Sequence, residues 1–406
     1  MKTLVIGSGP AGLIAASTAA NKNNQVIVLE KNEKAGKKLF ITGKGRCNVT
    51  NNCNEREFIA NVVSNPKFLF SAINKFSSKD TIDWFESKGC PLVIERGNRV
   101  FPKSYRAGDI ANALFGACKN NGVKFAFGES VIDVFKQEKQ FVVKTKNNTY
   151  SADKIVIATG GKSYSYTGST GDGYKFASRM GHTIVDPKPG LVTLKVKESI
   201  PSSLYKFTLK NVSLNVALGN KKYQEFGEVT FYKEGIAGAT ALTLSSLINR
   251  TNPNEISLSL DFKPALTNEK LDQRIIREIQ SKENQTLEHV VRKLLPKEMV
   301  DWFFGLTRIN KNRLTSEVKK EERESLVRNL KSFKFNFVGL DDIDRAVITS
   351  GGISTKEINP KTMESKLVPG LYFIGEVIDV DAFTGGFNMQ IAFSTGALAA
   401  ESIKNA

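Results

Sequence analysis

Residues 1–30 read MKTLVIGSGPAGLIAASTAANKNNQVIVLE, and this stretch decides the fold. Its two short apolar runs, Lys2 to Ile6 and Gln25 to Leu29, predict strands that are buried in a sheet. The segment between them is a glycine-rich turn that leads directly into an Ala-rich helix. Strand, turn, helix and strand in this order predict a βαβ unit with parallel strands.

The turn Gly7-Ser8-Gly9-Pro10-Ala11-Gly12 has the GxGxxG spacing of a dinucleotide site. Gly7 permits the tight turn, Gly9 lets a pyrophosphate approach the backbone, and Gly12 lets the helix pack closely on the strand. Glu30 follows about 20 residues later, where an acid binds an adenosine ribose. The stretch therefore predicts a bound dinucleotide, with its phosphates at the N-terminus of the helix.

Length and composition limit the class of protein. The chain has 406 residues, of which 40% are hydrophobic, which predicts two or three soluble globular domains. No apolar run approaches the ~18 residues that a transmembrane helix needs. The glycine turn interrupts the N-terminal apolar run, so we expect no signal peptide and a cytoplasmic location.

Cysteine and histidine usage argues against metal binding. The four cysteines, Cys47, Cys53, Cys90 and Cys118, form no CxxC, and the chain has only two histidines. This pattern predicts reduced thiols and no metal site.

The net charge of +17 is high for an enzyme that acts on small molecules. Residues 188–222 contain seven lysines and one glutamate, and residues 308–334 contain nine cations and four glutamates. Such basic regions attract polyanions, including nucleic acid. The alternative is a Lys-rich, solvated surface, and charge alone does not separate the two.

A basic, glycine-punctuated loop follows Glu30. Six cations and one acid lie between Lys31 and Arg46, and the segment Gly43-Lys44-Gly45-Arg46-Cys47-Asn48 lies at its end. A loop of this kind after the second strand is suited to wrapping a pyrophosphate, although an exposed turn cluster has the same composition. We favour the cofactor role, because the loop is close in sequence to the GxGxxG turn at residues 7–12, which we call the glycine fingerprint.

The next segments predict a mixture of helices and strands. Apolar spacing predicts helix over residues 55–88 and 109–120, and a strand pair over 91–101. Residues 123–127, 129–134 and 141–144 resemble the small antiparallel sheet of many flavin-binding domains.

Residues 153–157 predict another buried strand, which ends in Ala158-Thr159-Gly160. The long loop 163–173 then opens onto a helix, and we expect it to line the active site, although it has the composition of a connector. Near the C-terminus, residues 370–376 predict a strand that ends in Gly375-Glu376. A helix begins near Gly386, and its positive end would stabilise negative charge on a reduced flavin ring.

Between these segments the composition changes. Residues 191–262 read as short strands of an antiparallel barrel or sandwich, and residues 267–330 have helical spacing. We therefore predict an FAD-binding domain at 1–188 and 341–406. A β-rich insert would occupy 189–263 and about 331–340, and a helical insert 264–330.

The strand at 155–160 and the distant strand at 372–376, whose terminal acid suits the ribityl or pyrophosphate region, favour FAD over NAD. The chain has no second GxGxxG after a strand, so we expect no separate NAD domain. The segments 43–51, 158–164, 167–173 and 362–388 resemble the bacterial BaiN-like, or aminoacetone-oxidase-like, family of NAD(P)/FAD-dependent oxidoreductases. The chain departs from the family pattern at Ser165, where proline is common, and at residues 235–239. The second departure lies in the inserted region and bears on the substrate rather than on FAD.

The resemblance implies a Rossmann-like α/β FAD domain that is interrupted by a β-barrel-like domain and a small helical domain. It also implies flavin redox chemistry, with NAD(P)H as a transient donor. Family activities include amine oxidation, reduction of oxo-bile acids and reduction of uridine in ribosomal RNA. The charge favours uridine in RNA, with a small-molecule oxidase or reductase, or a flavin-stabilised RNA-binding factor, as alternatives.

The candidate site residues fall into three groups. Those expected to bind the cofactor are Gly7, Gly9, Pro10, Ala11, Gly12, Glu30, Lys31, Lys38, Arg46, Cys47, Asn48, Val131, Ala158, Thr159, Gly160, Gly375, Glu376, Gly386, Phe387, Asn388 and Met389. Those expected to line the substrate pocket are Tyr164, Thr167 and Ser350. Cys47 is the candidate proton donor, although a buried cysteine more often only packs.

Overall fold

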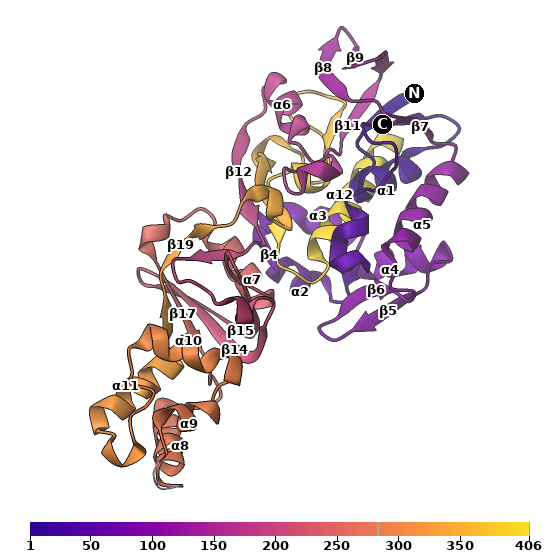
Figure 1. Ribbon diagram of the computed structural model, residues 1–406. Helices are drawn as coiled ribbons and strands as arrows, with labels where there is room; N and C mark the ends of the chain where they lie inside the picture. The colour runs from indigo at the N-terminus through magenta and orange to yellow at the C-terminus, as the bar shows by residue number, and fades with distance from the viewer. Residues whose placement is uncertain (282–284, 406) are drawn as a thin grey trace. The chain divides into compact units, whose positions relative to one another are not determined.

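The computed structural model describes residues 1–281 and 285–405 (Figure 1). It divides into two compact units, residues 1–190 with 343–406 and residues 191–342. Each unit has a hydrophobic core of its own.

The first unit is built on a five-stranded sheet in the order β21-β11-β1-β2-β7, with every neighbouring pair parallel. The strands are β1 (Lys2–Ile6), β2 (Gln25–Glu30), β7 (Lys124–Phe127), β11 (Lys154–Ile157) and β21 (Leu371–Phe373). The order reverses between β1 and β11, which is the switch point where open α/β sheets bind their ligands. The mixed α/β, Rossmann-like class predicted from the sequence is confirmed.

The helices of this unit are α1 (Pro10–Ala19), α2 (Glu55–Ala60), α3 (Phe70–Lys75), α4 (Ser78–Ser87), α5 (Ala107–Asn120), α6 (Asp172–Arg179) and α12 (Phe387–Lys404). α12 packs directly on α1, because a Cβ at Gly396 would lie 2.6 Å from the carbonyl oxygen of Ala11. On the side of α5, Asn121 donates to the Ser17 carbonyl of α1 at 2.7 Å. α1 is thus packed against both helices (Figure 1).

Smaller sheets complete this unit. Their strands are β3 (Thr50–Asn51), β4 (Val62–Ser64), β5 (Leu92–Glu95), β6 (Arg99–Pro102), β8 (Val131–Gln137), β9 (Gln140–Thr145), β10 (Thr149–Ala152), β12 (Ile184–Gly190), β20 (Ile348–Ile353) and β22 (Asp381–Ala382). β8, β9 and β10 form a three-stranded antiparallel sheet. β3, β6 and β5 form a second one.

Two predictions for this unit need correction. Residues 124–127 do not join the small antiparallel sheet, because they pair in parallel with Ile27–Glu30 at the edge of the main sheet. Residues 55–88 are not continuously helical, because β4 and a 3-10 turn at Pro66–Leu69 separate α2 from α3. Pro66 cannot continue a helix from the preceding residues, since it lacks a backbone N–H.

The second unit contains a seven-stranded antiparallel sheet in the order β18-β17-β14-β15-β16-β13-β19. Its strands are β13 (Leu194–Val196), β14 (Thr208–Leu218), β15 (Lys221–Tyr232), β16 (Gly235–Ala237), β17 (Ile256–Asp261), β18 (Phe333–Phe335) and β19 (Phe337–Leu340). Within residues 191–262, where we predict short strands, residues 208–218 form one long strand, β14.

The helices of this unit are α7 (Ala239–Ile248), α8 (Asn268–Gln280), α9 (Leu287–Arg292), α10 (Lys297–Thr307) and α11 (Lys320–Lys331). α7 lies within residues 191–262, where the sequence pattern predicts only strands. Leu258 of the sheet and Phe303 of α10 belong to the same core, so strands and helices share one interior here. The division into a β-rich and a helical domain stays a prediction, and its range 264–330 includes residues 282–284, outside the described part.

Over residues 1–281 and 285–405, no helix combines the length and the apolar character needed to cross a bilayer.

Candidate cofactor and substrate site

The glycine fingerprint lies at the switch point between β1 and β11. Gly7 has a φ of +104°, and a Cβ there would lie 2.5 Å from the carbonyl oxygen of Ala158. A Cβ at Gly12 would lie 2.0 Å from the Gly7 carbonyl oxygen, so no side chain fits at either position. Gly9 is different, because no heavy atom lies within 4 Å of the place that its Cβ would occupy. The turn therefore packs tightly against the protein at Gly7 and Gly12, and it leaves open space beside Gly9.

The N-terminus of α1 is available to an anion. No side chain caps this helix, whose first residue is Pro10. Uncapped N–H groups and the positive end of the helix dipole favour phosphate at this point. Two nearby segments carry buried polar atoms, Asn48 Oδ1 and Thr159 Oγ1, that have no hydrogen-bond partner within the described residues. The open turn, the uncapped helix and these atoms fit a dinucleotide that carries a pyrophosphate.

Glu30 is buried at the end of β2. One carboxylate oxygen accepts from the backbone and hydroxyl of Ser8, and the other accepts from the backbone and side chain of Asn32 at 2.8 and 2.7 Å. The backbone of Glu129 donates to the Glu30 carbonyl at 3.0 Å, which brings the start of β8 and Val131 toward this end of the site. Ser8 and Asn32 were not singled out from the sequence, although both are polar neighbours of fingerprint residues.

Lysines of the basic loop hold the loop that follows β11. Lys31 Nζ lies 2.7 Å from Asp172 and 2.6 Å from Thr170. Lys37 Nζ donates to the Tyr166 carbonyl at 2.9 Å. The two loops predicted to flank the cofactor are therefore joined to each other, and Lys31 is engaged with protein groups.

Tyr164 and Thr167 form one turn of that second loop. Tyr164 has a left-handed backbone, with a φ of +52°, and its carbonyl accepts from the Thr167 hydroxyl at 2.8 Å. Burial raises the pKa of the Tyr164 phenol. Thr167 is buried, so in this geometry its hydroxyl closes the turn.

Glu376 connects its own segment to three others in the first unit. It accepts from Lys38 Nζ at 2.7 Å, from the Ser163 hydroxyl at 3.0 Å and from the backbone of Thr349 at 2.8 Å. Burial by itself would raise the pKa of Glu376, but Lys38 and these hydrogen bonds together hold it below the usual value. A charged carboxylate beside Gly160 and Gly161 is the result.

The Gly43–Asn48 loop is tightly folded. Lys44 and Cys47 have φ values of +59° and +57°, on either side of Arg46. Cys47 has no exposed surface, and burial raises the pKa of its thiol to about 12. The thiol is therefore protonated at neutral pH and covered by protein. Arg46, in contrast, has a partly exposed side chain that pairs with Glu95 at 3.3 Å.

The start of α12 lies against β3. Gly386 has a φ of +101°, and a Cβ there would lie 2.4 Å from the backbone of Thr50. The Asn388 side chain bonds to the backbone of Ala382 in both directions, at 3.0 and 2.7 Å, and so holds the preceding loop. The N-terminus of α12 has no side-chain cap.

Neighbouring side chains fix this helix start. Phe387 packs edge-on against Phe58, and Met389 packs on the core. Gln390, which the sequence did not single out, is fully buried and accepts from the Thr50 hydroxyl at 2.6 Å. Gly375 has a φ of +71° and lies close to α1, because its Cβ would lie 2.8 Å from the Ala11 side chain.

Ser350 is fully buried beside a carboxylate. Its hydroxyl donates to Asp381 Oδ1 at 3.0 Å, and both residues are at most 1% exposed. The predicted substrate-lining position at Ser350 is therefore covered by protein in this structure.

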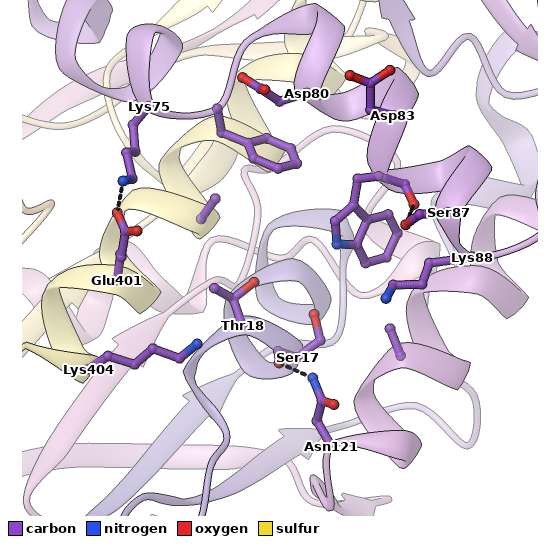
Figure 2. A pocket seen from close by; sticks show the side chains of 14 residues that line it. Ser17, Thr18, Lys75, Asp80, Asp83, Ser87, Lys88, Asn121, Glu401 and Lys404 are labelled. Carbon is purple, nitrogen blue, oxygen red and sulfur yellow. Dashed lines mark hydrogen bonds and ion pairs between the residues drawn. The ribbon is translucent and has the colours of Figure 1, made fainter.

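A cavity of about 670 Å³ lies away from the glycine fingerprint (Figure 2). It is lined by Ser17 and Thr18 from the far end of α1, with Trp84, the Lys75–Glu401 ion pair and Lys404. Ser17 lies seven positions after Pro10 along the helix, or roughly 10 Å. The cavity contains no cysteine or histidine, and we assign the chemistry to the switch point because dinucleotide sites occur there.

Comparison with known proteins identifies the family. The model of the family described as "HI0933-like protein Rossmann domain" matches residues 1–402. The chain is 30% identical to a 3-dehydro-bile acid delta(4,6)-reductase of Clostridium scindens, covering 97% of both chains. It is 29% identical to a ribosomal RNA dihydrouridine synthase of Escherichia coli, covering 98% of this chain and 97% of the relative.

A solved structure shares the fold over the full length. The 3-ketosteroid delta1-dehydrogenase of Sterolibacterium denitrificans superposes with a TM-score of 0.54 at 14% identity and 99% coverage of both chains. The chain belongs to the HI0933-like family and is an FAD-dependent oxidoreductase.

Proposed function

We propose that this oxidoreductase reduces uridine to dihydrouridine in ribosomal RNA, with NAD(P)H as the electron donor. The observation that carries the choice of substrate is the net charge of +17. A polyanionic substrate gives a reason for this charge, because cations that neutralise phosphates dominate RNA affinity. The relatives from Escherichia coli and Haemophilus influenzae, both named ribosomal RNA dihydrouridine synthase, support the same choice.

The cofactor would be held along the switch point. Gly9, Ala11 and Gly12 offer backbone at the open turn and the start of α1, where the pyrophosphate would bind. Glu30 lies at the end of β2 for the adenosine ribose, and Glu376 lies beside Gly160 for the ribityl region. Arg46, Asn48 and the start of α12 would contact the remaining part of the cofactor.

When bound, FAD supplies hydride transfer at N5 and takes hydride from a nicotinamide. The residues around it would orient the uracil, exclude water and deliver one proton, so that one hydride and one proton add across the C5–C6 double bond. The uncapped N-terminus of α12 would stabilise negative charge that develops near it.

The proton donor is the open part of this mechanism. Cys47 carries a protonated thiol, as a donor must, but it is fully covered in this structure. We therefore propose that it packs beneath the cofactor, and Cys47→Ala tests this. Unchanged dihydrouridine formation is expected, and a loss of turnover with normal FAD content would assign the proton to Cys47.

A small-molecule substrate is the second candidate. The Clostridium scindens relative is named for a 3-dehydro-bile acid, and it matches this chain at 30% identity over nearly its whole length. The same cofactor site would then reduce a double bond conjugated to a ketone.

The deciding experiment supplies the purified, FAD-loaded protein with NADPH or NADH and one substrate at a time. Ribosomal RNA free of dihydrouridine is digested afterwards and examined by mass spectrometry for uridine that has gained two hydrogens. Unsaturated 3-oxo steroids are offered in parallel, and nicotinamide oxidation is followed. Turnover of the steroid without reduced uridine would overturn the RNA proposal.

A further inference from the structure

A cluster of arginine and aromatic side chains includes Arg46 of the Gly43–Asn48 loop, which we propose contacts the cofactor. The Arg46 guanidinium carbon lies 4.5 Å from the centre of the Phe101 ring and 5.6 Å from that of Tyr105. The Arg99 guanidinium carbon lies 5.9 Å from the centre of the same Phe101 ring. We call Arg46, Arg99, Phe101 and Tyr105 the hairpin platform, because three of its members come from β6 and the residues just after it.

One carboxylate orients the platform. Glu95 pairs with Arg46 at 3.3 Å and with Arg99 at 3.5 Å. The Tyr105 hydroxyl also hydrogen-bonds to Glu95, which raises the pKa of the phenol. The two guanidinium groups and the phenol are therefore held in place before any ligand arrives, which lowers the entropy lost on binding.

The platform is open to solvent on its outer side. The side chains of Arg46 and Arg99 are 40% and 43% exposed, and Tyr105 is 41% exposed, while Phe101 beneath them is buried. Tyr105 also has a φ of +56°, an unusual conformation for a bulky residue. An exposed aromatic ring at a strained position is a surface that packing alone does not explain.

The charge around the platform favours a polyanion. Residues 43–46 and 92–106 together carry six cations and one acid, Glu95. Four of these cations lie outside the Glu95 pairs, and they are Lys44, Arg96, Lys103 and Arg106. Arginine and aromatic faces next to further cations are the combination with which proteins bind unpaired bases and their phosphates.

The platform is tied to the start of α12. β6 pairs with β3, with Thr50 opposite Val100 and Asn51 opposite Arg99. The Asn51 side chain donates to the carbonyls of Gly97 and Gly385, both at 3.1 Å. One strand and one side chain thus connect the β5–β6 turn to the segment proposed to contact the flavin.

We propose that the hairpin platform binds single-stranded RNA next to the uridine that is reduced, by stacking bases on Tyr105 and on the guanidinium plane of Arg99. This inference rests on the proposed function and identifies a binding surface for it within the first unit. A steroid substrate offers neither phosphates nor several bases, so it would give the platform no role.

The test uses full-length, FAD-loaded protein and a uridine-rich single-stranded RNA whose binding is followed by fluorescence anisotropy at several salt concentrations. Tyr105→Ala is expected to weaken binding about tenfold, the effect of losing one stacked base. Tyr105→Phe keeps the ring and should bind like the unmodified protein. Arg99→Ala should also reduce the slope of log affinity against log salt by about 0.7.

Controls separate binding from folding and cofactor loading. Arg179→Ala removes an equally charged arginine that pairs with Asp133 away from the platform, and it should leave affinity nearly unchanged. FAD content and NAD(P)H-dependent reduction of a small dye should be equal in all variants. If an alanine variant fails to fold, Arg99→Lys carries the test, with binding weakened about threefold because the planar group is lost.

The outcomes are distinguishable. Unmodified protein that reduces uridine, together with a Tyr105→Ala variant of full RNA affinity, would overturn the platform alone. Unmodified protein that neither binds nor reduces RNA would overturn the proposed function. Equal losses on fully paired duplex RNA would also contradict the platform, since stacking needs unpaired bases.

Discussion

Cys47 combines complete burial with a left-handed backbone, and its ionisation should be visible in stability. Burial raises the pKa of its thiol from 9.0 to about 12. Because the folded protein holds this proton more tightly than the unfolded chain, the stabilisation is complete below pH 9 and is lost as pH rises toward 12. At pH 10 the loss is about 1.4 kcal/mol for this thiol.

We expect Cys47→Ala to lose less stability than the unmodified protein between pH 8 and pH 10. Urea unfolding at both pH values measures the difference in the free energy of unfolding. Parallel pH dependence of the two proteins would show that the thiol ionises as freely in the fold as in the unfolded chain.

The stabilisation by Glu376 should depend on pH in the opposite sense to that by Cys47. Its pKa is held below the usual value, so its stabilisation is present above pH ~4.5 and is lost as pH falls. Glu376→Gln keeps an acceptor for Thr349 but loses the ion pair with Lys38. Since both side chains are about a fifth exposed, we expect a loss of about 1–2 kcal/mol at pH 7.

The matched control is Asp301→Asn, which breaks an ion pair of equal length, 2.7 Å, with Lys311 at an exposed site. This change should cost less than about 0.5 kcal/mol in chemical denaturation. Equal effects of the two substitutions, or an effect of Glu376→Gln that persists near pH 3, would contradict the role given to Glu376.

At the scale of elements, the start of α12 is held by backbone contact with β3. Gly386→Ala would place a Cβ 2.4 Å from Thr50 at a φ of +101°. We expect a loss of about 2–4 kcal/mol in the free energy of unfolding, together with reduced flavin absorbance per protein, because helix and strand must separate.

Gly116→Ala is the control within α5, where the Cβ meets nothing within 4 Å. A gain of up to about 1 kcal/mol is expected there, because alanine favours helix over glycine. A Gly386→Ala protein with normal stability and flavin content would mean that α12 does not need this close approach.

Elements with local signals were predictable, and those defined by distant partners were not. The fingerprint, the strand at 154–157 and the helix after Gly386 carry their glycines and apolar runs in sequence. The alternation of residues 124–127 fits a strand of the main sheet and a strand of the small antiparallel sheet equally well. Only the parallel pairing with β2 places these residues in the main sheet. α7, with the sequence ATALTLSSLI, has no charged residue, and its Thr240, Ser245 and Ser246 are buried together with apolar residues, so no charged face reveals the helical period.

In the candidate site, too, residues with local partners were predictable and residues with distant partners were not. Gly7 and Gly12 could be assigned because their neighbours lie within the fingerprint or directly after the next parallel strand. The Lys38–Glu376 pair joins residues 338 positions apart, and Arg46 meets Glu95 across 49 positions. Such pairs depend on the folded topology, and a single sequence contains no signal for them.

For the whole molecule, the distribution of the +17 charge decides where RNA would be attracted. Several cations of residues 308–334 are paired in the structure, including Lys311 with Asp301, Arg323 with Asp272 and Lys331 with Asp261. Within residues 1–281 and 285–405, neither Lys221 nor Lys222 has a carboxylate at ion-pair distance. These two lysines begin β15 and are exposed.

Unpaired lysines should therefore contribute more to RNA affinity than paired ones. We expect the double variant Lys221→Ala/Lys222→Ala to reduce the salt-dependence slope of single-stranded RNA binding by about 1.4, or 0.7 for each contact. The control Lys311→Ala/Lys320→Ala removes the same charge from lysines that lie beside Asp301 and Glu324, and should reduce the slope by less. Equal slopes would mean that net charge alone governs the affinity, whereas an unchanged slope in the first variant would exclude β15 from the RNA surface.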